Sequence, residues 1–169
     1  MDKRLEANMR FLCDESRMLT GITVAYGTTT YSEWAQYGRA QEIDQVENGF
    51  IPAVRPLIPD TIYDLASLTK LFTAVVTLAL VESGKLSLDE TVGQIDPRFV
   101  HLQNVTVGDV LSFRISLQTP GRIDTAPTRE EGLKRLFGVS VCPTPAIRVY
   151  SNMNAMVIKY VIEAKTGLS

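Results

Sequence analysis

The sequence predicts an α+β fold in which a helix and a β-hairpin precede a mostly helical remainder. Three observations support this prediction. Apolar residues recur at helical spacing near the N-terminus, they alternate with other residues in a short segment that follows, and helix-start signals recur through the second half of the chain. A two-stranded sheet is marginal by itself, so the hairpin requires a partner that this chain does not obviously supply.

The N-terminal elements are predicted from these periodicities. Leu5, Met9 and Leu12 have helical spacing, so an amphipathic helix is expected over residues 3–18. Alternation within residues 22–26, between two glycines, is typical of a strand.

The rest of the hairpin follows from turn chemistry. Thr28-Thr29-Thr30 is predicted to form a turn that leads into a second strand at residues 31–37. Residues 41–59 are polar and contain prolines, which indicates a loop with little periodic structure.

A strongly apolar helix is expected next. It begins near Ser67, after a short extended piece at residues 62–65, and ends at about Ser83, where Gly84 can adopt the left-handed cap conformation. Its central run, residues 71–81, is too short to cross a bilayer and is typical of a helix buried inside a protein.

Three capping-box spacings begin at Ser87, Thr106 and Thr128, and each indicates a helix start. A last helix is expected to end at Gly167. The expected later helices span residues 107–113, 129–137 and 152–164.

Length and composition fit one domain of ordinary globular character. The chain has 169 residues, of which 45% are apolar and 21% charged, with a net charge of −2. We expect a single partial domain over residues 1–169, with the helix, hairpin and loop in residues 1–60 and the mostly helical part in residues 61–169. Nucleic-acid binding is not indicated, because the chain lacks a basic footprint, and no segment has the roughly 20 apolar residues of a membrane span.

The N-terminus begins an amphipathic pattern and not the apolar core of a signal peptide, which favours a cytoplasmic protein. A chain that starts after a removed leader would look the same and would be extracytoplasmic. Cys13 and Cys142 fit no metal spacing, and we expect two free thiols, with a disulfide as the minority alternative. No metal or other cofactor is expected.

The first chemical motif is Ser67-Leu68-Thr69-Lys70, an S-x-x-K sequence. By itself it also fits an exposed serine and lysine one turn apart. Its context favours chemistry, because Ser67 stands at the positive end of a helix dipole and Lys70 lies on the same helix face. Burial of Lys70 by the apolar helix would favour the neutral amine that a general base requires.

The second motif is Tyr150-Ser151-Asn152. A tyrosine can relay a proton and an asparagine amide can bind a substrate amide, although by itself the tripeptide is most simply a tyrosine that ends a strand before a helix cap. His101, the one histidine, lies in a polar linker and is expected to be structural or exposed. A lysine base is therefore the economical alternative to the familiar histidine.

Together these segments resemble a known superfamily. Residues 59–70 are similar to the nucleophile segment of class C β-lactamases and of related DD-peptidases and esterases, within the serine β-lactamase and penicillin-binding protein superfamily. Residues 82–90 and the Y-x-N tripeptide at Tyr150 carry the same resemblance, which extends from about Gly21 to Gly167.

The resemblance implies a role for each motif residue. Ser67 is the acylated nucleophile, Lys70 its base or proton relay, and Tyr150 a proton shuttle to the leaving group. Asn152 binds the acyl-side amide of the substrate, and the backbone N–H of Ser67 supplies one oxyanion-hole donor.

Two departures from the family accompany this resemblance. The family's third motif, K-T-G or H-x-G, belongs on a later strand, whereas Lys165-Thr166-Gly167 is predicted to be a helix C-cap. Relatives often have a His-Thr-Ser-Gly-Leu run where this chain has residues 113–117, which puts any role of that loop in doubt. The expected fold is thus an incomplete β-lactamase/transpeptidase-like fold that lacks the C-terminal strands.

The leading hypothesis is a serine acyl-transfer hydrolase, weak or inactive as this chain, that acts on a small-molecule or peptide acyl substrate: a β-lactam, a D-Ala-D-Ala peptide or an ester. The alternative is a non-catalytic remnant or binding module of the same fold. In both cases the hairpin is expected to expose an edge that could pair with a second copy or with a C-terminal complementing chain.

Overall fold

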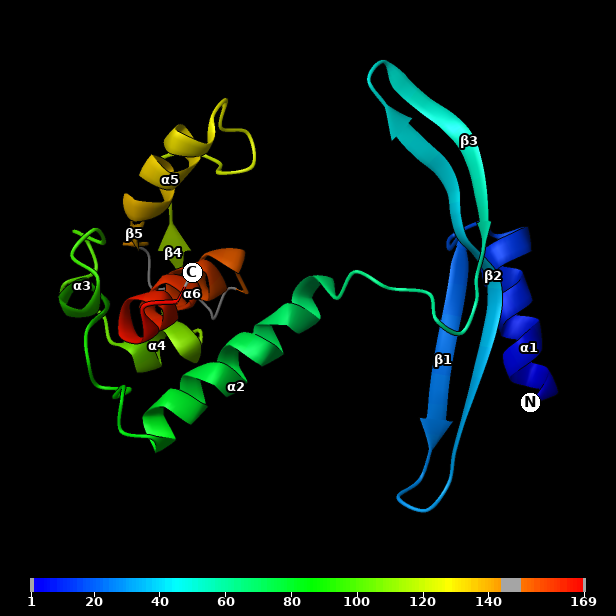
Figure 1. The fold of residues 1–169 in the computed structure, drawn as a ribbon, viewed down its shortest axis with the longest axis horizontal. Helices are drawn as coiled ribbons and strands as arrows, with labels where there is room; N and C mark the ends of the chain where they lie inside the picture. The colour runs from blue at the N-terminus through cyan, green and yellow to red at the C-terminus, as the bar shows by residue number, and fades with distance from the viewer. Residues whose placement is uncertain (1, 144–149, 169) are drawn as a thin grey trace. The chain divides into compact units, whose positions relative to one another are not determined.

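The computed structural model describes residues 2–143 and 150–168 (Figure 1). They contain both helices and strands, as expected for an α+β fold, and form two compact units, residues 1–64 and 65–169. The elements of the first unit are α1 (Lys3–Arg10), β1 (Gly21–Gly27), β2 (Ser32–Val46) and β3 (Gly49–Pro56). Those of the second are α2 (Thr69–Glu82), α3 (Val92–Ile95), α4 (Val107–Leu111), β4 (Leu117–Gln118), α5 (Arg129–Phe137), β5 (Ser140–Val141) and α6 (Asn152–Thr166).

The N-terminal helix is shorter than predicted. Asp2 caps α1 by accepting a hydrogen bond from the Arg4 N–H, and α1 continues into a π-helical turn, Phe11–Glu15. Arg17 then adopts a left-handed conformation with φ of +52°, which ends the helical segment before residue 18. α1 lies alongside β2 (Figure 1).

The sheet of the first unit has three antiparallel strands in the order β1-β2-β3, so the prediction of a loop over residues 41–59 is wrong. β2 continues to Val46 and turns at Gly49 into β3. The long β2–β3 ribbon was hidden in the sequence because its apolar side chains, such as Ile43, Phe50 and Val54, are exposed and form no buried face, so that backbone pairing holds it. The prolines of β3 are tolerated because β3 is an edge strand.

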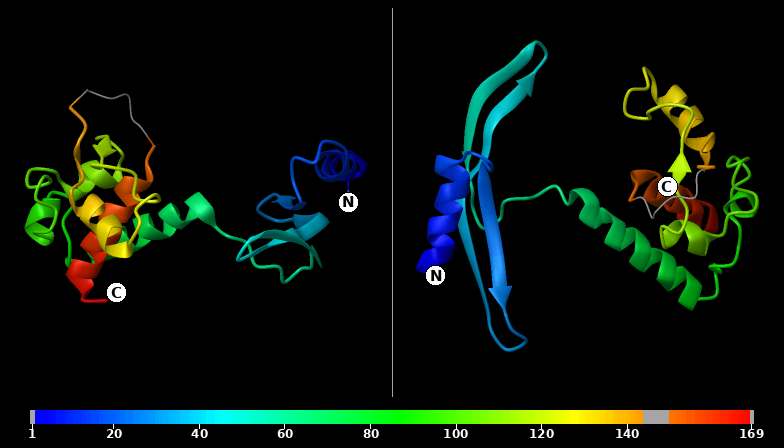
Figure 2. Two further views of the ribbon diagram at one scale, coloured as in Figure 1. Left: turned by 90° about the horizontal axis from the view of Figure 1, so that it is seen from above. Right: turned by 180° about the vertical axis from the view of Figure 1, so that it is seen from behind.

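The second unit is built around α6, which packs against α2, α3 and α4 (Figures 1 and 2). Predicted helix starts are confirmed at Thr106 and Thr128, whose hydroxyls accept hydrogen bonds from the N–H groups of Asp109 and Glu131. Ser87 forms only a capped turn, and the next helix begins later, at Val92. Side chains with at most 1% exposure form the core: Val92, Phe99, Leu102, Val107, Val110, Leu136, Val139, Val157, Ile158 and Val161.

The burial expected for α2 is not found within the described residues. In this helix only Thr77 and Leu80 are buried. Six apolar side chains on or just before α2 are 44–65% exposed: Leu68, Leu71, Phe72, Val75, Val76 and Leu78. The sequence pattern identified an all-apolar helix correctly, but the described chain covers only one side of it.

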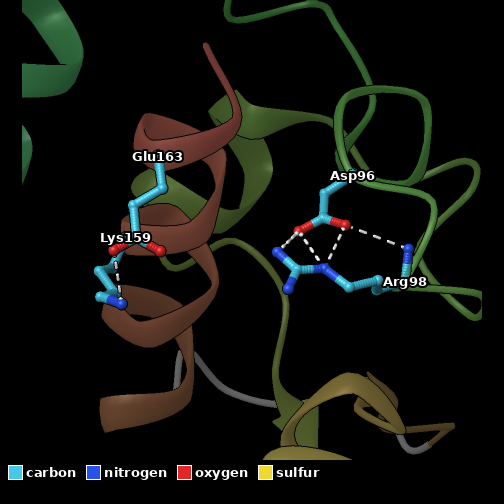
Figure 3. Close-up of polar contacts among 4 residues, drawn as sticks. All are labelled: Asp96, Arg98, Lys159 and Glu163. Carbon is cyan, nitrogen blue, oxygen red and sulfur yellow. Dashed lines mark hydrogen bonds and ion pairs between the residues drawn. The ribbon is translucent and has the colours of Figure 1, made fainter. Parts of the chain in front are cut away.

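Asp96 and Arg98 form an ion pair in the second unit (Figure 3). Asp96 is 4% exposed and accepts hydrogen bonds from both the backbone N–H and the guanidinium of Arg98. The Arg98 guanidinium lies 4.3 Å from the ring centroid of Phe137 and 5.2 Å from that of Tyr160, which both contact Phe99 edge-on. The hydrogen bonds from Arg98 hold the pKa of Asp96 below its usual range.

The remaining expectations concern cysteines and membranes. Cys13 is buried and Cys142 is half-buried, and both thiols are free. Over residues 2–143 and 150–168, the helices are all too short or too polar for a bilayer crossing.

Candidate active site

Ser67 stands at the entrance to α2. It is the central residue of a 3₁₀ turn, Ala66–Leu68, that leads directly into the helix, and its side chain is exposed. The preceding residue, Ala66, has a φ of +44°. A left-handed conformation is unfavourable for alanine and persists only where its surroundings enforce it, and such strain clusters at functional sites.

Lys70 lies in the first turn of α2 and faces Ser67. Its Nζ is 3.4 Å from Ser67 Oγ and 2.7 Å from Asn152 Oδ1, and both oxygens accept hydrogen bonds from the ammonium. The side chain is half-buried, in agreement with the partial burial that the apolar helix predicted. Asn152 thus fixes the amine beside the serine hydroxyl.

Tyr150 completes the group. The Lys70 Nζ lies 4.8 Å from the centroid of its ring, and the tyrosine is 62% exposed. Hydrogen bonding with Ser67 and then with Lys70 lowers the pKa of the phenol below its usual value. Desolvation opposes each of these with a weaker effect, and the positive charge of Lys70 adds a still smaller lowering. A phenol with a lowered pKa is better suited to exchange protons near neutral pH.

All four predicted site residues therefore meet, although the chain separates Lys70 from Asn152 by about half its length. The packing of α2 on α6 explains the meeting. Ser151 caps α6 by accepting a hydrogen bond from the Met153 N–H, which sets Asn152 at the first helical position. The start of α6 thus faces the start of α2.

Two other candidates were set aside on sequence grounds, His101 and Lys165-Thr166-Gly167. His101 is exposed in a turn and lines neither of the two hollows beside Ser67. Gly167 ends α6 in the left-handed conformation, with φ of +71°, and Lys165 forms an ion pair with Glu90. Because α6 rises 1.5 Å per residue, Lys165 is about 20 Å from Asn152 along the helix. Lys165-Thr166-Gly167 is therefore the predicted helix C-cap.

An apolar hollow of about 590 Å³ adjoins Ser67 and Lys70. Its walls come from α2, α4 and α6 and include Leu71, Val110 and Ile158. Pockets that bind small molecules are commonly lined in this way, by apolar side chains with a few polar groups.

Two residues of this wall were missed by sequence reasoning. Asn154 is 1% exposed, and its Nδ2 donates a 2.9 Å hydrogen bond to the carbonyl oxygen of Val110, which ties α6 to α4. Asn154 could have been recognised in the sequence, because it is an amide side chain within an otherwise largely apolar helix. Phe113 has a φ of +54° and stacks on Tyr150, and no sequence signal could reveal that contact.

Comparisons with known proteins agree on one family. The family described as Beta-lactamase matches residues 24–169. Penicillin-binding protein 4 of Amycolatopsis lactamdurans is 25% identical over 120 residues, which are 65% of this chain and 31% of that protein.

Solved structures show the same fold. A class C beta-lactamase in complex with cefoxitin superposes with a TM-score of 0.72 at 23% identity, over 99% of this chain and 45% of that one. A beta-lactamase/D-alanine carboxypeptidase from Pseudomonas syringae superposes with a TM-score of 0.70 at 18% identity, over 98% and 44%. The chain therefore spans less than half of the length of these structures, as expected for an incomplete fold.

Proposed function

The chain belongs to the beta-lactamase family of serine hydrolases, and from this premise we propose that Ser67 is a nucleophile that forms an acyl-enzyme. Membership of the family confirms the resemblance expected from residues 59–70. The observation that carries the proposal is the position of the Lys70 Nζ, 3.4 Å from Ser67 Oγ and 2.7 Å from Asn152 Oδ1. A lysine held beside a serine hydroxyl is one of the arrangements that activate serine as a nucleophile.

In the proposed reaction, Lys70 and Tyr150 carry the protons that move as Ser67 is acylated. Lys70, in its neutral form, accepts the Ser67 proton as Oγ attacks the carbonyl carbon of a β-lactam, a D-Ala-D-Ala peptide or an ester. The C–N or C–O bond breaks, Tyr150 delivers a proton to the leaving group, and the protonated Lys70 passes the proton taken from Ser67 to Tyr150. Water then hydrolyses the acyl-serine bond. The lowered pKa of the Tyr150 phenol and its place beside Lys70 support its role as proton shuttle.

The proposed turnover of this 169-residue chain is slow. The backbone N–H of Ser67 supplies one oxyanion donor. In the family the second donor comes from the strand that carries the third motif, whereas Lys165-Thr166-Gly167 of this chain is the C-cap of α6. Loss of one oxyanion donor lowers kcat by about 10²–10³-fold. Both acylation of Ser67 and hydrolysis of the acyl-enzyme are therefore expected to be slow.

The experiment that tests the proposal is active-site labelling. A fluorescent penicillin and a fluorophosphonate are incubated with the wild-type chain, and mass spectrometry identifies the modified residue. We expect an adduct on Ser67 that is absent in Ser67→Ala. Ser32→Ala is the matched control, because Ser32 is exposed at the start of β2, in the other unit, and this variant should be labelled like wild type.

Two outcomes would contradict the proposal. One is equal labelling of Ser67→Ala and wild type, and the other is the absence of any adduct in a chain whose helical circular dichroism shows it to be folded. Fast, multiple-turnover hydrolysis of a chromogenic β-lactam would instead contradict the slow turnover proposed above.

A second candidate, a non-catalytic module that pairs with another chain, is favoured by the exposed apolar side chains of α2. The sheet adds others, with Trp34, Phe50 and Val54 more than half exposed. Among the described residues β1 pairs only with β2, which leaves its outer edge available to a second copy or a complementing chain. Apolar surfaces of this kind favour association.

We expect the chain to self-associate as its concentration rises, measured by size-exclusion chromatography with light scattering. Phe72 and Val75 are 61% and 65% exposed, and each apolar side chain that an interface buries contributes about 1.5–3 kcal/mol. The double variant Phe72→Ser/Val75→Ser should therefore raise the dissociation constant by at least about tenfold. A wild-type chain that remains monomeric at all concentrations would exclude pairing with a second copy.

A further inference from the structure

Phe113 occupies a backbone position that normally belongs to glycine. At the end of α4 the N–H of Phe113 donates to the carbonyl oxygen of Val110 at 3.2 Å, and the N–H of Arg114 donates to that of Asp109 at 3.0 Å. These two bonds form a Schellman motif with Phe113 in its left-handed position, at a φ of +54°. Glycine is common there because a Cβ atom is unfavourable, and a bulky aromatic residue is an outlier.

The ring of Phe113 contacts one residue of the proposed catalytic group. It is stacked on the ring of Tyr150, with centroids 5.7 Å apart and an interplanar angle of 10°. Tyr150 is otherwise largely exposed, and an exposed tyrosine exchanges among rotamers within nanoseconds. A stacked partner on a rigid support selects the rotamers that preserve the contact.

The support of Phe113 is rigid. Val110, which accepts the hydrogen bond from the Phe113 N–H, is fully buried. Its carbonyl also accepts the hydrogen bond from the buried Asn154 of α6, the helix whose start is flanked by Tyr150. Phe113 and Tyr150 are thus attached to two helices that a buried amide ties together.

We propose that Phe113 is a positioning residue that holds the Tyr150 phenol beside Ser67 and Lys70. The unfavourable backbone conformation at residue 113 is maintained because it directs the aromatic ring onto Tyr150. The effect on acylation rests on the function proposed above, whereas the effect on the phenol does not.

The direct test is the titration of Tyr150. The chain is labelled with ¹³Cζ-tyrosine, and Tyr150→Phe identifies the Tyr150 resonance among those of the six tyrosines. In wild type its pKa is below the usual tyrosine value, because Ser67 and Lys70 contact the phenol. Phe113→Gly and Phe113→Leu should raise that pKa toward the usual value, since the phenol leaves its partners, and Phe113→Trp should keep it low.

These variants separate positioning from a merely structural role. Phe113→Leu keeps the apolar bulk and the backbone strain but lacks an aromatic face, whereas Phe113→Gly relieves the strain as well. Labelling of Ser67 should slow by roughly 10–100-fold in both, as expected for a misplaced proton donor, and Phe113→Trp should restore it. Arg17→Gly is the control, because it relieves backbone strain at a left-handed residue of the other unit. It should leave the Tyr150 pKa and the rate of Ser67 labelling unchanged.

The outcomes distinguish the two proposals. If wild-type Ser67 is not labelled but the Tyr150 pKa rises in the Gly and Leu variants, the proposed function fails and the positioning role stands. If both variants keep the wild-type pKa in folded chains, the positioning role is wrong. Should Phe113→Gly unfold the chain, Phe113→Leu carries the same test.

Discussion

Replacing Lys70 with methionine is expected to lower the rate of Ser67 acylation by about 10²–10⁴-fold, the range contributed by a positioned general base. Methionine keeps an unbranched chain of similar length but has no amine to accept the serine proton. The hydrogen bonds to Ser67 Oγ and Asn152 Oδ1 are lost with it. The rate is measured as the time course of fluorophosphonate labelling.

Two further variants assign the effect to base chemistry. Lys70→Arg retains the positive charge and can still donate to Asn152, but a guanidinium does not lose its proton in proteins, so acylation should remain slow. Lys85→Met is the control, since Lys85 is an exposed lysine beyond the end of α2 and its loss should not change the rate. Wild-type rates in Lys70→Arg would show that Lys70 acts only as a charge.

Asp96→Asn is expected to destabilise the helical unit by about 2–4 kcal/mol at pH 7, because it breaks a pair whose carboxylate is buried. The guanidinium of Arg98 would lose its bidentate hydrogen bonds to the carboxylate while it remains over the rings of Phe137 and Tyr160. Urea unfolding followed by circular dichroism at 222 nm reports this unit. Fluorescence of Trp34, the single tryptophan, reports the sheet unit and should not shift.

The sequence offers a matched control with the same spacing. Arg122 and Asp124 also form an ion pair two residues apart, and the pKa of Asp124 is likewise lowered by its arginine, but both side chains are mostly exposed. Asp124→Asn should therefore leave the urea midpoint unchanged. If Asp124→Asn and Asp96→Asn lowered the free energy of unfolding equally, burial of the Asp96 carboxylate would not explain the effect.

The effect of Asp96 should also depend on pH. Because the folded-state pKa of Asp96 is below the unfolded value of about 3.9, its contribution is fully present above that value and is lost as the pH falls through the folded-state pKa. The difference between wild type and Asp96→Asn should therefore shrink below about pH 4. A difference that grows on acidification would mean that the sign of the shift is wrong.

Local signals in the sequence determined most of the helical architecture. The hydroxyls of Thr106 and Thr128 begin helices as predicted, and Gly167 ends one, because capping depends on residues within one turn of each other. The long ribbon of β2 and β3 was missed, because the pairing of two largely exposed strands depends on backbone partners that composition does not reveal.

The sequence by itself determined the fold class, the family and the residue types of the candidate site, since the S-x-x-K and Y-x-N motifs are short and local. Only the tertiary structure decided that Lys70 contacts Asn152, that Phe113 stacks on Tyr150 and that the apolar side of α2 stays exposed within the described chain. The reason is physical: such contacts join segments that are distant in sequence, and their geometry depends on how the helices pack and not on the preferences of any single segment.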